Sequence, residues 1–161
     1  MARRIGAFLL AQTHSDRALL SFRMDKNTLP AVTNDPTKTL AQLLPNGATY
    51  QNGVRPGARK FEQFKEVLTL RGVPALCSQD GKGREAIAYV KLFDPCGAWI
   101  CYITEWDGQD EIYGMVTLFE EELGYNSLAG LATERGARGI GLEIDMSFRP
   151  MTLREALSKR P

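Results

Sequence analysis

Four acidic side chains have the residue type and spacing that a metal-dependent enzyme would need. Glu105 and Asp107 lie two positions apart in a run rich in β-branched and aromatic residues, and Glu143 and Asp145 repeat that spacing. Residues two apart share one face of a β-strand, so adjacent strands would bring four carboxylates together. Such a group would bind Mg²⁺ and support phosphodiester chemistry, which predicts a metal-dependent nucleic-acid-processing enzyme. Carboxylates on a solvated strand face serve solubility equally well, so this is the alternative hypothesis.

Nucleophilic catalysis finds less support. The single histidine, His14, lies in a polar stretch without an evident partner and is interpreted as a surface-loop residue. Cys77, Cys96 and Cys101 are spaced for neither a zinc site nor a disulfide framework, which predicts reduced, buried thiols. The Gly81–Gly83 segment lacks the spacing of a phosphate-binding loop. No cofactor is therefore expected.

Acidic residues around the chain's central segment favour a non-catalytic function, the binding of a protein partner. A basic surface, such as the nucleic-acid groove of an effector in a bacterial host, would be complementary to them because carboxylates imitate phosphates electrostatically. The candidate partner-binding residues are Glu105, Asp107, Asp110, Glu120, Glu121 and Glu122.

Charge is divided unevenly along the sequence. The net charge is only +1, which argues against a dedicated nucleic-acid binder, but residues 1–80 carry +5 and residues 81–161 carry −4. A basic group near one predicted helix could contact phosphates directly, and this is a secondary hypothesis. Its members are Arg55, Arg59, Lys60 and Lys65.

The elements that would position these residues centre on a sheet. Three strand-like runs, 87–93, 99–106 and 112–119, are separated by turn sequences, which is typical of an antiparallel β-meander. The first run is apolar on both faces and predicts a covered, central strand. Gly114 predicts a bulge or a close backbone approach. A fourth strand is expected over 140–148, where apolar and polar residues alternate.

Helices are expected on either side of this sheet. Helical spacing and capping residues predict helices over 36–44 and 58–70, the second ending at Gly72, another over 127–135, and a final turn that starts at Thr152 with Glu155 in a capping box. Apolar runs at 5–10 and 18–24 predict an N-terminal β-hairpin. The expected fold class is α+β: an antiparallel β-meander with short flanking helices, plus an N-terminal hairpin and two helices.

Length and hydropathy place limits on the whole. With 161 residues and 43% hydrophobic residues, the chain is long enough to bury a core. The apolar run after Arg3 and Arg4 is too short for a secretory signal or a membrane span, so a cytoplasmic protein with no membrane contact is expected.

The C-terminal part resembles a known family. The segments that carry the likeness are 75–83, 89–93, 104–108, 122–128, 134–136 and 143–148. In order and with few gaps they are similar to the bacterial, plasmid and phage family called domain of unknown function twenty-nine fifty-eight. The likeness covers about 67–161, so 1–66 is treated as a separate N-terminal region that could belong to the same domain.

This resemblance implies a small α+β domain often encoded on mobile elements, near genes for anti-restriction or plasmid maintenance. The leading prediction is a non-catalytic interaction protein of a mobile element that inhibits a host defence complex such as CRISPR or restriction. Two departures from the family pattern stand out. Ala137-Arg138-Gly139 replaces a proline that usually follows the Arg-Gly pair, and Ile144 replaces an arginine between the two acidic residues.

Overall fold

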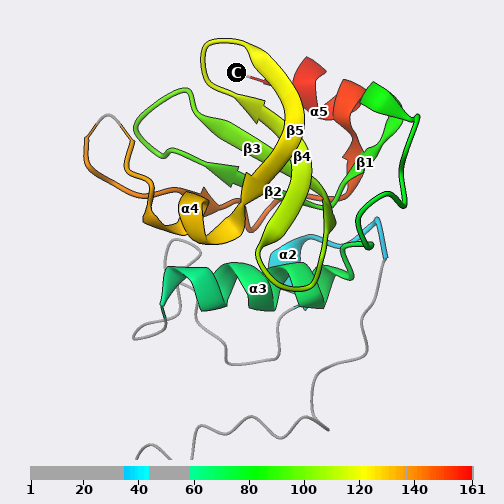
Figure 1. The fold of residues 1–161 in the computed structure, drawn as a ribbon, viewed down its shortest axis with the longest axis horizontal. Helices are drawn as coiled ribbons and strands as arrows, with labels where there is room; N and C mark the ends of the chain where they lie inside the picture. The colour runs from blue at the N-terminus through cyan, green and yellow to red at the C-terminus, as the bar shows by residue number, and fades with distance from the viewer. Residues whose placement is uncertain (1–34, 44–58, 137, 161) are drawn as a thin grey trace, which may run out of the picture.

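The structure, a computed structural model, describes residues 35–43, 59–136 and 138–160. The predicted hairpin at 5–10 and 18–24, His14 and Arg55 lie outside these residues. The described part is an α+β arrangement in which helices pack on an antiparallel sheet (Figure 1). The predicted fold class is confirmed for this part of the chain.

Five strands form the main sheet, and every adjacent pair is antiparallel. Its order from edge to edge is β5-β4-β3-β2-β6. The strands are β2 (Val90–Phe93), β3 (Ile100–Trp106), β4 (Glu111–Thr117), β5 (Glu121–Ser127) and β6 (Glu143–Ile144). The meander from β2 to β4 is as predicted, and β2 lies between two neighbours as expected of a covered strand.

The first predicted strand is divided in two. Its start, β1 (Ile87–Ala88), leaves the main sheet and pairs with β7 (Met151–Thr152). The buried amide of Gln79 explains the break. Its Oε1 accepts from the Ile87 amide at 2.7 Å, and its Nε2 donates to the carbonyls of Ile87 and Thr104 at 3.0 Å each. The side chain therefore takes the backbone groups that direct pairing of β1 with β3 would use.

The bulge and the close backbone approach, which the sequence predicts as alternatives at Gly114, are both present. The β3–β4 register shifts between Ile103 and Glu105, which is a bulge at Thr104. Directly opposite, a Cβ added to Gly114 would lie 2.1 Å from the carbonyl oxygen of Tyr102. The two backbones approach so closely that only glycine fits at this position of β4.

The sequence missed one strand and overextended another. β5 was not predicted, because its Glu, Gly and Asn residues are poor strand formers. The predicted strand 140–148 is reduced to β6. It stops because the Asp145 carboxylate accepts from the Ser147 amide at 3.0 Å, and the Phe148 amide bonds the Asp145 carbonyl at 3.2 Å, which turns the chain.

The helices lie where the sequence predicts them, but their lengths differ from the predicted ones. α3 (Lys60–Arg71) ends at Gly72, whose φ of 61° is left-handed as predicted. α2 (Leu40–Leu43) is shorter than predicted because Asp35 holds 35–38 in a turn by accepting from the Thr37 amide at 2.9 Å. α4 (Leu128–Thr133) and α5 (Leu153–Ser158) begin as expected, after the capping side chains of Ser127 and Thr152. In the predicted capping box, Thr152 Oγ1 accepts from the Glu155 amide at 3.1 Å, whereas the Glu155 carboxylate binds Lys159.

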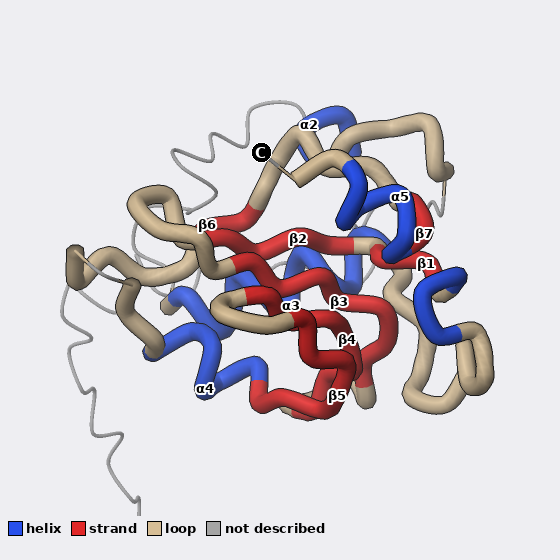
Figure 2. The backbone as a smooth tube through the Cα atoms, turned by 90° about the horizontal axis from the view of Figure 1, so that it is seen from above, coloured by secondary structure: helices blue, strands red, loops and turns tan. Residues whose placement is uncertain are grey.

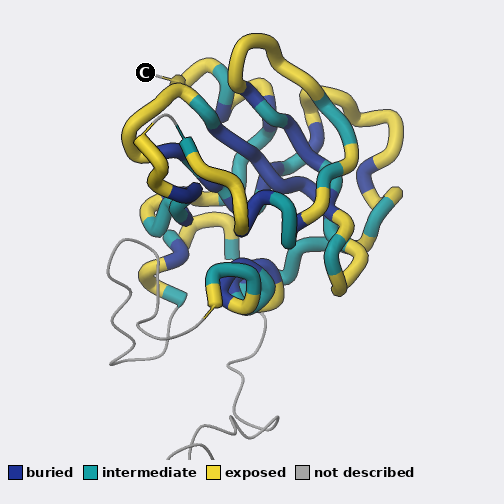
Figure 3. Tube along the Cα trace, turned by 60° about the vertical axis from the view of Figure 1, so that its left-hand side comes forward, coloured by how far each residue is buried: buried dark blue, intermediate teal, exposed yellow. Residues whose placement is uncertain are grey.

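Helices cover the two faces of the sheet unequally. α2, α3 and α4 pack on one face around Phe64, Cys101 and Ile103. The other face holds a smaller cluster with α5 and β1, around Tyr102 and Phe148 (Figure 2). Burial is deepest in the central strands (Figure 3). Covering the sheet on both faces fixes which side chains remain accessible at its edges.

The cysteines are reduced, as predicted, but only one is buried. Cys101 is enclosed in the core, and burial raises its pKa to about 12. Cys77 and Cys96 are exposed, so the prediction of buried thiols is wrong for them. Both lie in turns where the backbone amide donates to a carboxylate, Cys77 to Glu105 and Cys96 to Asp94.

Candidate protein-binding site

Glu105 has a structural position. It is 2% exposed in β3, and its two carboxylate oxygens accept from the backbone amides of Cys77 and Gln79. These bonds hold the 75–80 turn, in which Cys77 has a φ of 66°. A buried carboxylate whose two oxygens both accept from backbone amides is not exposed for contact with a partner surface.

Asp107 and Asp110 organise the neighbouring turn and helix. Asp107 Oδ1 accepts from the amides of Gln109 at 2.7 Å and Glu111 at 3.1 Å, which closes the β3–β4 turn. Asp110 accepts from the Ser127 hydroxyl at 2.9 Å and from the Ala129 amide at 2.7 Å. A carboxylate at this helix start compensates the free amides of its first turn. Both residues are thus explained by local structure.

The four carboxylates of the metal hypothesis do not come together. β2 separates β3, which carries Glu105, from β6, which carries Glu143. Asp145 instead pairs with Lys91, Nζ to Oδ2, at 3.0 Å. Across residues 35–43, 59–136 and 138–160, no group of three or more His, Cys, Asp or Glu side chains could hold a metal ion. The structure therefore does not bring these four side chains into one cluster.

Ile144, which stands where the resembling family usually has arginine, belongs to the core. It is 3% exposed and pairs with Leu92 in the β2–β6 ladder. At this position the chain has packing rather than a charged group.

The three consecutive glutamates differ in their surroundings. Glu121 binds Arg84 at 2.8 Å and approaches Arg160 at 3.8 Å, so its charge is compensated. Glu120 and Glu122 are exposed, and within the described residues neither carboxylate takes part in an ion pair or a hydrogen bond. Of the six predicted partner-binding acids, these two are exposed and have carboxylates without a partner among the described residues.

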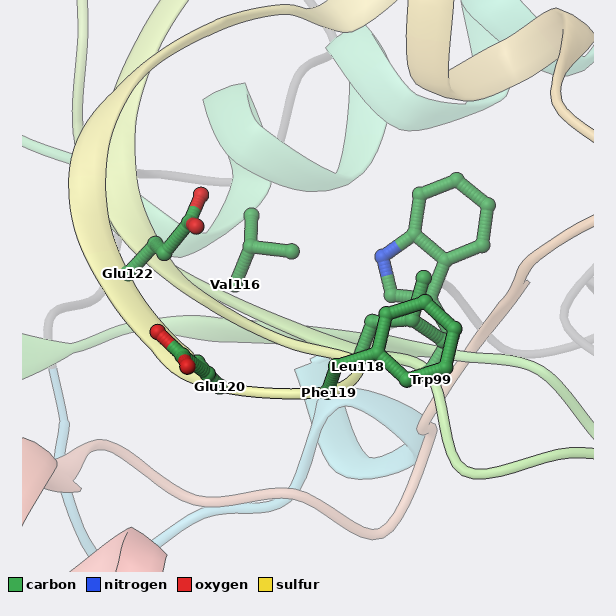
Figure 4. Close-up of a pocket in the computed structure, with 6 residues that line it drawn as sticks. All are labelled: Trp99, Val116, Leu118, Phe119, Glu120 and Glu122. Atoms are coloured by element: carbon green, nitrogen blue, oxygen red, sulfur yellow. The ribbon is translucent and has the colours of Figure 1, made fainter.

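Beside them lies an exposed apolar patch at the tip of the β4–β5 hairpin. Phe119 is 95% exposed and Leu118 44% exposed. Together with Trp99 and Val116 they line a pocket of about 340 Å³, whose remaining lining is Glu120 and Glu122 (Figure 4). We call these six residues the hairpin-tip patch. It combines an apolar floor with an acidic rim.

Trp99, which lines this pocket, carries an unused hydrogen-bond donor. Its Nε1 is buried and has no partner within the described residues. Figure 4 shows the indole nitrogen on the side of the ring that faces Val116 and Glu122. A buried donor without an acceptor is unfavourable, so an acceptor that enters the pocket would be stabilised there.

The predicted basic group is only partly described. Arg59 is exposed, whereas Lys65 lies 5.4 Å from the ring centroid of Phe61. Burial, and secondarily the nearby charge of Arg135, lowers the pKa of Lys60. Arg59 and Lys60 lie at the start of α3, and Lys65 lies further along the same helix.

Sequence reasoning identified Glu120 and Glu122 but missed the apolar half of the patch. Leu118 and Phe119 were assigned to the end of a strand, although β4 ends at Thr117. A signal was present, since two large apolar residues directly precede three glutamates at a hairpin turn. Trp99 pairs with Asp94 across the preceding turn, and only the fold brings it beside Leu118.

Comparison with known proteins identifies a family to which this chain is similar but no activity. No curated protein and no solved structure matches the chain. No helix among the described residues has the length and apolarity needed to cross a membrane. The family model described as protein of unknown function (DUF2958) matches residues 71–158, which is more than half of the chain and contains the whole main sheet. The predicted resemblance is confirmed, and the chain belongs to the DUF2958 family.

Proposed function

We propose that this protein acts by binding another protein through the hairpin-tip patch, without catalysis. The observation that carries the proposal is Phe119, which is almost fully exposed beside an apolar pocket. Burying a phenylalanine side chain contributes roughly 2 kcal/mol, and an exposed phenylalanine does not gain this free energy. Exposed aromatic residues next to a pocket are common centres of protein interfaces.

The chemistry of the patch defines its partner. An apolar side chain would enter the pocket, a carbonyl or carboxylate beside it would accept from Trp99 Nε1, and Lys or Arg side chains would meet Glu120 and Glu122. The carboxylates mainly steer and orient such a partner, while the apolar contact supplies affinity. The partner surface is therefore apolar at its centre and basic at its rim.

A nucleic-acid-binding effector of a bacterial host has such basic surfaces. Inhibition of a defence complex, CRISPR or restriction, is the form of the proposal that this charge pattern favours, because carboxylates in the groove would exclude phosphates. The mobile-element setting implied by the family resemblance is part of the same proposal. Direct binding of nucleic acid by this protein is the competing outcome.

The experiment is affinity capture from a nuclease-treated bacterial lysate with two matched variants. The double variant Glu120→Lys and Glu122→Lys, and separately Phe119→Ser, are expected to lose the captured protein. The control is Glu62→Lys with Glu134→Lys, which makes the same charge change at exposed positions on α3 and after α4. It is expected to retain the partner.

Two results would refute the proposal. One is a captured protein that both patch variants retain, because binding would then use another surface. The other is a bound set that disappears on nuclease treatment of the wild type, because the ligand would then be nucleic acid.

A further inference from the structure

Among the residues that the structure describes, the β5 edge of the sheet is open. Within the described residues β5 pairs only with β4, and none of its seven residues is buried. Figure 2 shows no described element beyond it on that side. The opposite edge is β6, which has only two residues. A very short edge strand is protected from pairing by its length, whereas a seven-residue edge is not.

At its centre β5 also lacks the usual devices that prevent edge pairing, because its two charged residues, Glu121 and Glu122, lie at one end. Its sequence has no lysine and no proline, and its ladder with β4 is regular over all seven residues. At its centre Gly124 faces open space, and Tyr125 is 56% exposed. The centre of the edge is thus flat, uncharged and accessible.

Ladder geometry identifies which backbone groups face outward. The Leu128 amide donates to the Asp110 carbonyl at 2.7 Å, one step beyond the Glu111–Ser127 pair. Because hydrogen-bonded and non-hydrogen-bonded pairs alternate in an antiparallel ladder, the even-numbered residues of β5 bond to β4. The odd-numbered residues 121, 123, 125 and 127 therefore direct their N–H and C=O groups away from the sheet.

We propose that β5 pairs antiparallel with β5 of a second copy of this chain, about a two-fold axis at Gly124. This register joins odd-numbered residues to odd-numbered residues, so the outward groups of both strands are satisfied. It places Leu123 opposite Tyr125, Glu122 opposite Asn126 and Glu121 opposite Ser127. Two five-stranded sheets become one continuous sheet.

The side chains make this strand complementary to itself in that register. An aromatic residue opposite an aliphatic one is a favourable cross-strand pair, and it would cover the exposed ring of Tyr125. No glutamate faces a glutamate. In-register parallel pairing would instead set Glu121 and Glu122 beside their own copies, where like charges repel.

The dimer would also change how the hairpin-tip patch is presented. Each tip directly precedes β5, so antiparallel pairing places the two patches at opposite ends of the joined strands, roughly 30 Å apart. Two patches on one particle would bind a repetitive or dimeric partner with avidity. The dimer does not depend on the proposed function.

Cysteine cross-linking of the full chain tests both whether a second copy pairs with β5 and in which register it pairs. In a background with Cys77→Ser and Cys96→Ser, Gly124→Cys puts two thiols on the axis, at a non-hydrogen-bonded pair where a disulfide fits. It is expected to cross-link under oxidised glutathione at least tenfold faster than Glu122→Cys, which faces residue 126 rather than itself. Mixing Glu122→Cys with Asn126→Cys chains is expected to restore fast cross-linking.

Sedimentation velocity gives the second readout. The interface is small, so a dimer that forms at roughly tens of micromolar is expected. Tyr125→Lys is expected to weaken it at least tenfold, whereas Asn126→Lys, which faces Glu122, is expected to retain it. A wild type that stays monomeric up to roughly 300 μM would overturn the proposal. So would equal cross-linking of Gly124→Cys and Glu122→Cys, because any dimer would then use another surface.

Discussion

Two glycines that face each other across β4 and β5 allow a sharp test of the packing. Gly114 and Gly124 are register partners, but their surroundings differ. A Cβ at Gly114 would lie 2.1 Å from the Tyr102 carbonyl oxygen and 3.2 Å from the Ile103 Cα, both backbone atoms of β3. A Cβ at Gly124 would have no atom within 4 Å. Alanine should therefore be strongly destabilising at Gly114 and nearly neutral at Gly124.

The cost of Gly114→Ala follows from the distance. Ordinary contact between a carbon and an oxygen needs a little over 3 Å, so β3 and β4 must separate by about 1 Å at the centre of the sheet. This weakens about two ladder hydrogen bonds, at about 1 kcal/mol each, and adds an overpacking cost of about 1 kcal/mol or more. We expect a loss of about 3 kcal/mol for Gly114→Ala and a change within about 0.5 kcal/mol for Gly124→Ala.

Urea unfolding followed by tryptophan fluorescence measures both variants against the wild type. For a chain of this size, about 3 kcal/mol corresponds to a decrease in Tm of roughly 6–12 °C, which calorimetry can check. Equal destabilisation by the two substitutions would refute the reasoning, because loss of glycine flexibility, and not the close approach to Tyr102, would then set the cost. A neutral Gly114→Ala would mean that the bulge at Thr104 relaxes freely.

Two further predictions concern carboxylates. Glu105→Gln is expected to lower the free energy of unfolding by about 1–3 kcal/mol and to speed hydrogen exchange at the Cys77 and Gln79 amides, because an NH₂ group would face a backbone donor. The control is Asp107→Asn, which keeps its accepting oxygen. Unchanged exchange in Glu105→Gln would contradict the role of Glu105. For Asp145, burial opposes ionisation, but hydrogen bonds from Ser147 and Lys91 outweigh it and lower the pKa. Its charge therefore stabilises the fold above the unfolded pKa of about 4, and that contribution is lost as pH falls through the lower folded value. Asp145→Asn is expected to flatten the decline of the unfolding free energy below about pH 5, as measured by denaturation at several pH values, and a decline as steep as in the wild type would refute this.

The sequence predicted the parts of the fold that depend on local pattern. β3 and β4 follow from runs of β-branched and aromatic residues, and the Gly72 end of α3 follows from helical spacing plus a glycine. β5 could not be predicted in this way. Its residues have low strand propensity, and pairing with β4 imposes the extended conformation on them.

The roles of the acidic residues show a second limit of sequence reasoning. Glu105 and Asp107 share a spacing that suggests ligands, yet Glu105 is occupied by amides that lie 26 and 28 positions earlier in the chain. Backbone donors have no sequence signature, so nothing local distinguishes this buried carboxylate from an exposed one. The four carboxylates do not come together because spacing along one strand does not specify which strands are adjacent.

The three consecutive glutamates at 120–122 do not share one surface, because side chains alternate between the two faces of a strand. Alternation along β5 sends Glu121 to the face where Arg84 and Arg160 bind it, whereas Glu122 points to the side of Val116 and Trp99. A substitution of all three glutamates would therefore mix the loss of an internal ion pair with the loss of a binding surface. Changing Glu120 and Glu122 while leaving Glu121 in place separates these effects, since only the apolar pocket and its acidic rim are then altered.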